Sequence, residues 1–206
     1  MDPSTRRAAA ARETRRRVVE AARDSFLELG YPATTIRGIA ERAGVSQETI
    51  YKAFRSKAGL LKVVYDVTMA GDDDDRPIAE RPEAKAVVEA ATPAAAAAAY
   101  AELARTLNDR AWPLVRTVLA ARGGSAEIDE FLGVIDGERL VGAGMHVAGW
   151  DRKGWLRPGL STARARDLVW MFNSPAVKQL AEDRGWSDAE FDDWLTEVLR
   201  SQVLDG

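Results

Sequence analysis

Apolar residues recur at every third or fourth position along most of the chain, and no segment shows the strict alternation that is typical of a β-strand. The first helical stretch ends at Gly30, a residue that commonly terminates helices. Three short helices are predicted next, opening at the Thr34–Thr35 pair, at Ser46 and at Ser56, because hydroxyl side chains can cap a helix N-terminus. The pattern therefore predicts an all-α fold.

The rest of the chain repeats the helical pattern after an acidic interruption. Residues 71–77 contain four consecutive aspartates, which could suggest a calcium-binding loop, but the spacing, turn glycine and terminal glutamate of an EF-hand are absent. A solvated loop between helices is the better interpretation. Further helices are predicted over residues 82–90, 93–122, 125–147, 161–172, 175–184 and 187–203.

Net charge differs between the two parts of the chain. The 206 residues include 29 Lys+Arg and 32 Asp+Glu, a formal charge of −3. Residues 1–62 hold 13 basic and seven acidic residues, a net charge of +6, and the remainder carries −9. A basic segment attached to an acidic remainder favours a polyanion-binding head. A basic tail that only keeps the protein soluble fits the charge alone equally well.

The composition excludes several kinds of chemistry. There is no cysteine, which excludes disulfides and thiolate sites, and the single histidine, His146, excludes multi-histidine metal sites. The chain also lacks a Gly-x-x-x-x-Gly-Lys phosphate loop and an apolar run long enough to span a membrane. We therefore expect a cytoplasmic protein that binds rather than catalyses, without a metal or a cofactor.

Residues 35–54 match a helix-turn-helix pattern. In the first helix, the small Ala40 allows the two helices to approach closely, and Gly44 allows the positive φ that a tight turn requires. In the second helix, Ile50 and Phe54 lie four residues apart and anchor it on the same core. The side chains left outward on that helix are Ser46, Gln47, Glu48, Thr49, Tyr51 and Lys52. Most of them can form hydrogen bonds to base edges and phosphates in a major groove.

This part of the chain resembles a known family. Residues 30–46 contain the sequence GYPATTIRGIAERAGVS, and residues 48–61 contain ETIYKAFRSKAGLL. Over about residues 13–65 the chain closely resembles the DNA-binding domain of TetR-family transcriptional regulators. Segments at 159–161 and 184–187 are also similar to regulators common in actinobacteria.

Residues 1–11 are rich in arginine and alanine and show no apolar period, which predicts a flexible basic arm. The resemblance implies a helix-turn-helix DNA-binding domain at 12–56 and a helical regulatory and dimerisation domain at 57–206. It also implies a homodimer whose two heads bind a palindromic operator on double-stranded DNA, with half-sites one helical turn apart. The residues expected to contact DNA are Thr34, Thr35, Arg37, Ser46, Gln47, Thr49, Tyr51, Lys52 and Lys57.

Two features of this head leave alternatives open. Glu48 departs from the small or basic residue that is usual at its position in the family. It could accept a hydrogen bond from a cytosine amino group, or it could cap its own helix. The arginine-rich arm could enter a minor groove or stay a disordered tether.

The family also implies an effector pocket in the middle helices and a dimer interface through the last two long helices, about residues 161–183 and 187–203. Candidate pocket residues are Tyr100, Trp112, Arg116, Phe131, Met145, His146, Trp150 and Trp170. Large aromatic residues are more often core than pocket, and the glycines around His146 fit a close helix crossing equally well. An effector should be mainly apolar with one or two polar groups.

Three functions follow for comparison. The leading hypothesis is a homodimeric regulator, most often a repressor, that a small molecule releases from DNA. An enzyme with an accessory DNA-binding head would need a nucleophile and base, a phosphate loop or a metal cluster, and the sequence offers none of these. An effectorless or architectural DNA-binding protein would bind many sequences with steep salt dependence and show no ligand response.

Overall fold

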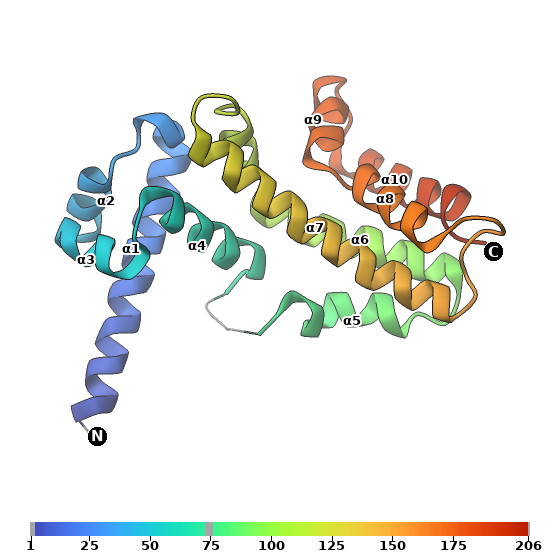
Figure 1. Cartoon of the computed structure of the whole chain (residues 1–206), viewed down its shortest axis with the longest axis horizontal. Coiled ribbons are helices and arrows are strands. Elements are labelled where there is room, and N and C mark those ends of the chain that lie inside the picture. The colour runs from blue at the N-terminus through green and yellow to red at the C-terminus, as the bar shows by residue number, and fades with distance from the viewer. Residues whose placement is uncertain (1–2, 73–75, 206) are drawn as a thin grey trace. The chain divides into compact units, whose positions relative to one another are not determined.

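A computed structural model of the chain describes residues 3–72 and 76–205. In these residues the chain forms ten α-helices and one short 3-10 helix (Figure 1). The elements are α1 (Pro3–Ala33), α2 (Ile36–Ala43), α3 (Gln47–Phe54), α4 (Lys57–Ala70), η1 (Ile78–Glu80), α5 (Pro82–Glu89), α6 (Pro93–Leu119), α7 (Ala126–Arg152), α8 (Thr162–Phe172), α9 (Pro175–Asp183) and α10 (Asp188–Gln202). Within the described ranges, β-type pairing is limited to one isolated bridge between Leu156 and Leu204. The predicted all-α fold is confirmed.

Local capping sets the starts of the short helices. The side chains of Thr35, Ser46 and Ser56 each accept a hydrogen bond from a backbone amide of the helix that they open. The last helix begins with the predicted capping box, in which Ser187 and Glu190 each bond the other's backbone amide. The sequence was therefore sufficient to locate these helix starts.

The basic arm differs from its prediction. From Pro3 onward it is helical and continuous with α1, whereas its composition predicted a flexible segment over residues 1–11. The physical reason is composition, because alanine and arginine are among the strongest helix formers even without an apolar stripe. The helix is interrupted only at Gly30, whose φ of 75° and ψ of 165° are non-helical, and the predicted stop at that glycine is confirmed.

The described helices form two compact units. Unit 1 consists of residues 1–74 and 113–132, and unit 2 consists of residues 75–112 and 133–206. Helices α6 and α7 therefore each have residues in both units. This division differs from the expected boundary after residue 56, because α4 and parts of two later helices belong with the head.

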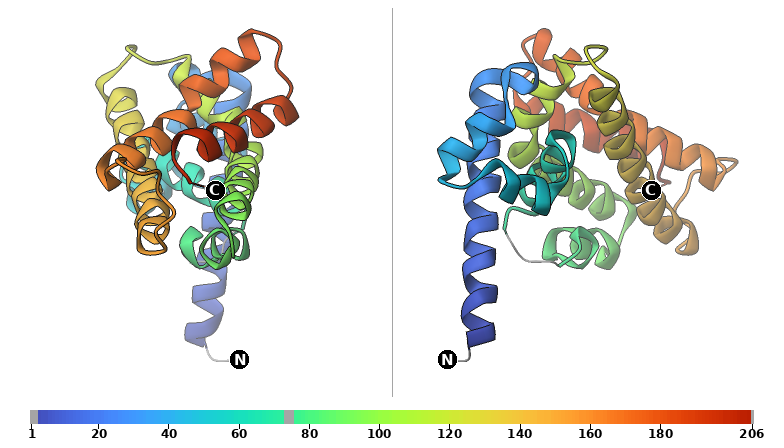
Figure 2. Two further views of the ribbon diagram at one scale, coloured as in Figure 1. Left: turned by 90° about the vertical axis from the view of Figure 1, so that its right-hand side faces the viewer. Right: turned by 60° about the vertical axis from the view of Figure 1, so that its left-hand side comes forward.

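Unit 1 has its own apolar core. Side chains from α1, α2, α3 and α4 are fully buried in it, among them Phe26, Ile39, Ile50, Leu60 and Leu61. Both α3 and α4 are in contact with neighbouring helices of this unit, and α4 also packs against α1. The N-terminal half of α1 projects past α2, α3 and α4 (Figures 1 and 2). The helix-turn-helix is thus held by a four-helix core from which one basic helix extends.

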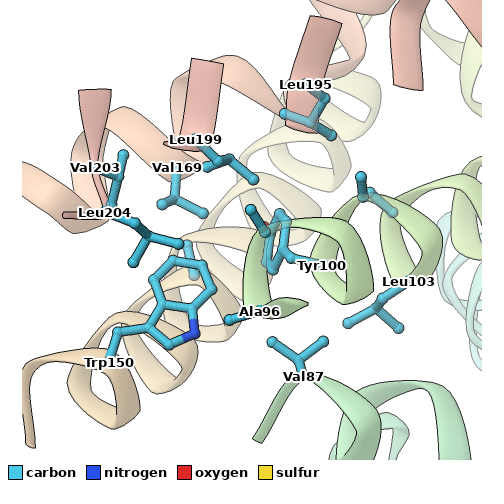
Figure 3. Close-up of a cluster of buried hydrophobic side chains, with 14 of the residues drawn as sticks. Val87, Ala96, Tyr100, Leu103, Trp150, Val169, Leu195, Leu199, Val203 and Leu204 are labelled. Carbon is cyan, nitrogen blue, oxygen red and sulfur yellow. The ribbon is translucent and has the colours of Figure 1, made fainter. Parts of the chain in front are cut away.

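Unit 2 has a core of its own, with buried side chains from α5, α6, α7, α8 and α10. Figure 3 shows Tyr100 of α6 and Trp150 of α7 close to Val169 of α8 and Leu199 of α10. Apolar side chains of α10 that could have served a surface are instead buried here, including Leu195 at 0% exposure. The predicted helical body is therefore a packed domain in its own right.

Candidate nucleic-acid interface

The geometry of the helix-turn-helix follows from three capping positions. The Thr35 hydroxyl oxygen accepts from the Gly38 amide at 3.0 Å and starts α2. Gly44 ends α2 in the left-handed conformation, with φ 65° and ψ 41°, which glycine adopts without the strain that a Cβ would add. The Ser46 hydroxyl oxygen accepts from the Thr49 amide at 3.1 Å and starts α3. The turn between α2 and α3 is thereby fixed at both ends.

The inner face of the motif is as predicted, with one exception. Ile39 and Ala40 of α2 and Ile50 and Phe54 of α3 are all buried. Ala53, for which the apolar pattern of α3 also predicts an inward position, is exposed. Burial of Ile50 and Phe54 on the inner side leaves the opposite side of α3 facing outward.

That outward side carries three of the predicted contact residues. Gln47, Tyr51 and Lys52 lie there together with Glu48, at the i, i+1, i+4 and i+5 spacing of one helix face, and all four are exposed. Tyr51 is the most apolar of them, and it is 51% exposed in the described chain. A helix with this width and surface fits a major groove about 12 Å wide.

The alternative roles of Glu48 can now be compared. The side chain that caps α3 is Ser46, whose hydroxyl also lies 2.9 Å from the Thr49 hydroxyl. Glu48 lies in the first turn, where its negative charge interacts favourably with the helix dipole, and its side chain is exposed. Capping therefore does not use the Glu48 carboxylate, and its contact with a base stays a prediction.

Thr35 and Arg37 lie at the exposed start of α2. The Arg37 Nε donates to the Glu41 carboxylate at 2.9 Å, and this ion pair raises the pKa of Arg37 above its usual value. Because both side chains are well exposed, the pair contributes little and can exchange for a phosphate. Both residues remain candidates for phosphate contact.

Thr34 does not fit the predicted role. Its side chain is 1% exposed, and its hydroxyl donates toward the backbone carbonyls of Ser25 at 3.0 Å and Gly30 at 2.7 Å. The hydroxyl is therefore used inside unit 1 to close the break between α1 and α2. The sequence could not separate Thr34 from Thr35, since both are threonines at a helix start.

Lys57 also has a different role from the one predicted. Its ammonium group donates to the carbonyls of Tyr31 and Thr34, both at 2.9 Å, and lies 4.1 Å from the centre of the Tyr31 ring. Partial burial lowers the pKa of this ammonium, and the charge of Glu127 partly offsets the effect. Lys57 thus joins the start of α4 to the end of α1, a structural role in place of a DNA clamp.

Two further arginines, which were not among the predicted contact residues, lie against the helix-turn-helix. The Arg15 guanidinium lies 4.9 Å from the centre of the Phe54 ring, at the end of α3. The Arg17 guanidinium lies beside the turn, 3.9 Å from the position that a Cβ on Gly44 would occupy. The sequence signal was the run of arginines at 15–17, whose direction only the packing of α1 could decide.

Three of the eight pocket candidates meet in unit 2. The ring centres of Tyr100 and His146 are 5.3 Å apart in an edge-on arrangement, and those of Tyr100 and Trp150 are 5.8 Å apart. Burial lowers the pKa of His146 to about 4, so this imidazole is neutral at pH 7. Its Nδ1 is buried and has no hydrogen-bond partner in the described structure. An unpaired buried nitrogen of this kind costs free energy unless a ligand or water supplies a partner.

Polar groups lie next to this aromatic cluster. Burial raises the pKa of the Tyr100 phenol, and a hydrogen bond with Asn173 and the charge of Arg139 partly offset the rise. The Arg139 guanidinium donates to the carbonyls of Trp170 at 2.7 Å and Asn173 at 2.6 Å, which holds the end of α8 against α7. The Trp170 indole donates to Asp136, a bond that fixes its ring in the fold.

The other candidates do not join this cluster. Met145 is 57% exposed on α7. Consecutive residues of a helix point in different directions, so Met145 does not share the buried position of His146. Arg116 is exposed and Phe131 is buried edge-on against Tyr65, and both belong to unit 1. Trp112 is partly buried, with an indole nitrogen that lacks a partner among the described residues.

Two other expectations have a limited structural counterpart. Residues 73–75 of the acidic run lie outside the described residues, so its interpretation as a solvated loop stays a prediction. Among the helices of the described ranges, none combines the length and the apolar character that a membrane span requires.

The all-α fold and the exposed recognition helix α3 define a helix-turn-helix protein of the DNA-binding regulator class. The family model described as "Bacterial regulatory proteins, tetR family" matches residues 18–64. The uncharacterized HTH-type transcriptional regulator YdeS of Bacillus subtilis is 30% identical over 163 residues, which cover 76% of this chain and 74% of YdeS. The chain belongs to the TetR family of bacterial regulatory proteins.

Other similarities cover a shorter part of the chain or concern the fold. YvkB, an uncharacterized HTH-type transcriptional regulator of Bacillus subtilis, is 42% identical over 53 residues, 26% of this chain and 28% of YvkB. Among solved structures, FadR from Bacillus subtilis in complex with stearoyl-CoA has a TM-score of 0.68 at 22% identity, covering 89% of this chain and 96% of that chain. The structural likeness shows a shared fold. Since these relatives come from Bacillus, the predicted actinobacterial type stays a prediction.

Proposed function

We propose that this chain is a homodimeric transcriptional repressor that binds a palindromic operator through two copies of α3 and leaves it when a small, mainly apolar effector binds unit 2. The observation that carries the proposal is the capped helix-turn-helix, whose apolar side is buried while Gln47, Tyr51 and Lys52 face outward. Gln47 and Lys52 have hydrogen-bonding groups for base edges, and Tyr51 has a hydroxyl for a phosphate.

The dimer would form through the C-terminal helices, as the family resemblance implies. Phe191, Leu195 and Leu199 of α10 are buried within unit 2, whereas Trp194 and Val198 are only partly buried. The exposed apolar side chains of this region are Leu180 of α9, at 64%, together with Met171 and Trp186. They are the residues that favour association of two copies. Leu180→Glu should therefore convert the dimer to a monomer in sedimentation, whereas a fully dimeric variant would exclude α9 from the interface.

The effector would contact the cluster of Tyr100, His146 and Trp150. The three rings offer an apolar surface, and the unpaired Nδ1 of His146 offers one polar contact to a neutral ligand. Since α6 and α7 have residues in both units, a ligand that binds these helices can favour one arrangement of the DNA-binding head. Such a ligand shifts DNA binding only by the difference between its affinities for the bound and released states.

The test is selection of binding sites by the full chain from a pool of random duplexes, followed by footprinting at two salt concentrations. The proposal expects one palindrome with half-site centres about 34–36 Å apart. Protection spread over all sequences, with a steep salt dependence alone, would support an architectural protein and overturn the proposal.

Substitutions on α3 test the assignment of the interface. Tyr51→Ala and Lys52→Ala should each weaken binding to the selected palindrome and leave the thermal unfolding midpoint unchanged, because both side chains are exposed. Ala53→Ser, also exposed on α3, is a matched control for a surface change without loss of a contact group. Full binding by both alanine variants would show that α3 is not the recognition helix.

A further inference from the structure

The first turns of α1, residues 5–13, form an exposed basic helical segment. Residues 5–13 are all exposed, and together they make about 13 Å of helix at a rise of 1.5 Å per residue. Arg6, Arg7 and Arg12 form no ion pair with any residue that the structure describes. The family match begins only at residue 18, so this segment lies outside the shared DNA-binding head.

We propose that this helical extension is a second DNA contact, which binds the phosphate backbone beside the half-site that α3 occupies. The proposal rests on the function proposed above, since it places the extension next to an operator-bound head. The geometry favours this position because α1 passes the motif directly: Arg15 lies over Phe54 at the end of α3, and Arg17 lies beside the turn at Gly44. Residues that precede Arg15 on the same straight helix therefore extend outward from the recognition motif.

Charge identifies duplex DNA as the partner. A helix that binds a membrane surface or an apolar groove needs an apolar face, and residues 8–11 of the extension are alanines with no large apolar neighbour among residues 5–17. Its long side chains are arginines, with Glu13 as the acid that pairs with Arg16 at 2.7 Å. Duplex DNA presents about one negative charge per 1.7 Å of its axis, which complements such a helix along its whole length.

The helical conformation also decides the mode of contact. A minor groove about 6 Å wide cannot admit an α-helix, whose diameter with side chains is about 10–12 Å. The major groove is assigned to α3. The remaining mode is contact with phosphates on the outside of the duplex. Such contact neutralises charge without reading the base sequence.

The test measures binding of the full chain to its selected palindrome as a function of salt. Each phosphate contact contributes about 0.9 to the slope of log K against log salt. Replacing Arg6, Arg7 and Arg12 together with glutamine removes three arginines from each subunit, so the slope should fall by about 2–3 per subunit, or about 5 for the dimer. Binding should weaken by more than about 100-fold at 0.15 M salt, equally for specific and random duplexes. The unfolding midpoint should not change, because none of these side chains contributes to the core.

The control is the same loss of charge at exposed arginines of unit 2, by glutamine at Arg164, Arg184 and Arg200. It should leave the slope unchanged. An unchanged slope in the Arg6/Arg7/Arg12 variant, while the unaltered chain still binds its palindrome, would overturn the inference and leave the proposed function standing. A preference for A·T-rich flanks that these substitutions abolish would also overturn it, because the segment would then read the minor groove. Absence of any palindrome for the unaltered chain would instead refute the proposed function.

Discussion

Replacing Lys57 with methionine should destabilise unit 1 and leave the DNA contacts of α3 unchanged. The substitution keeps the length of the side chain and removes its charge. It removes two hydrogen bonds, each 2.9 Å long, from the ammonium to the carbonyls of Tyr31 and Thr34, together with its contact with the Tyr31 ring. Hydrogen bonds to a charged group contribute roughly 1.5–3 kcal/mol each. A cation above an aromatic ring adds about 0.5–1 kcal/mol at a site open to solvent.

The lower ends of these contributions sum to about 3.5 kcal/mol, and the loss should be smaller than this sum because Lys57 is only half-buried and water can reach part of the site. We therefore expect the free energy of unfolding to fall by about 2–3 kcal/mol. In a domain of this size, the thermal midpoint should fall by about 5–10 °C. Thermal and denaturant unfolding followed by circular dichroism measure this loss.

Lys52→Met is the matched control, because Lys52 is exposed on the outward side of α3. It should change stability by less than about 0.5 kcal/mol and lower the salt slope of DNA binding by about 0.9 per subunit, or about 2 for the dimer. The Lys57→Met variant, measured at a temperature at which it is folded, should keep the full salt slope of DNA binding. The reasoning is refuted if Lys57→Met is as stable as the unaltered chain and loses a unit of slope, since Lys57 would then be a DNA clamp.

Three further outcomes follow from the structure. Thr34→Val should cost about 1–3 kcal/mol in denaturant unfolding, because the carbonyls of Ser25 and Gly30 lose a buried donor; a neutral effect would contradict that bond. Gly44→Ala should cost about 1 kcal/mol from its positive φ alone, since the nearest atom to the new Cβ is 3.9 Å away, and a loss above 3 kcal/mol would indicate a clash. For His146, burial lowers the folded-state pKa from 6.5 to about 4, so the folded chain binds the proton more weakly than the unfolded chain. Stability should fall by about 3 kcal/mol as pH drops from 6.5 to 4, and His146→Phe should remove that part of the pH dependence in unfolding titrations.

The sequence by itself determined the features that depend on neighbouring residues. Apolar spacing predicted the helices, the hydroxyl residues Thr35 and Ser46 located the helix starts, and Gly44 marked the turn. These features depend on the backbone and on side chains within four positions, so a local pattern contains the information. The outward face of α3 followed in the same way from the inward positions of Ile50 and Phe54.

Only the tertiary structure decided which polar residues were already used inside the fold. Thr34 and Thr35 have the same side chain, yet one is buried under two carbonyls and the other caps α2 in solvent. The family resemblance predicted a DNA contact for Lys57, but its partners lie 23 and 26 residues earlier in the chain. Likewise, Tyr100 of α6 and His146 of α7 are in contact, whereas Met145, next to His146 in the sequence, is exposed. The direction and the partner of a side chain depend on contacts between distant segments, and no local pattern contains them.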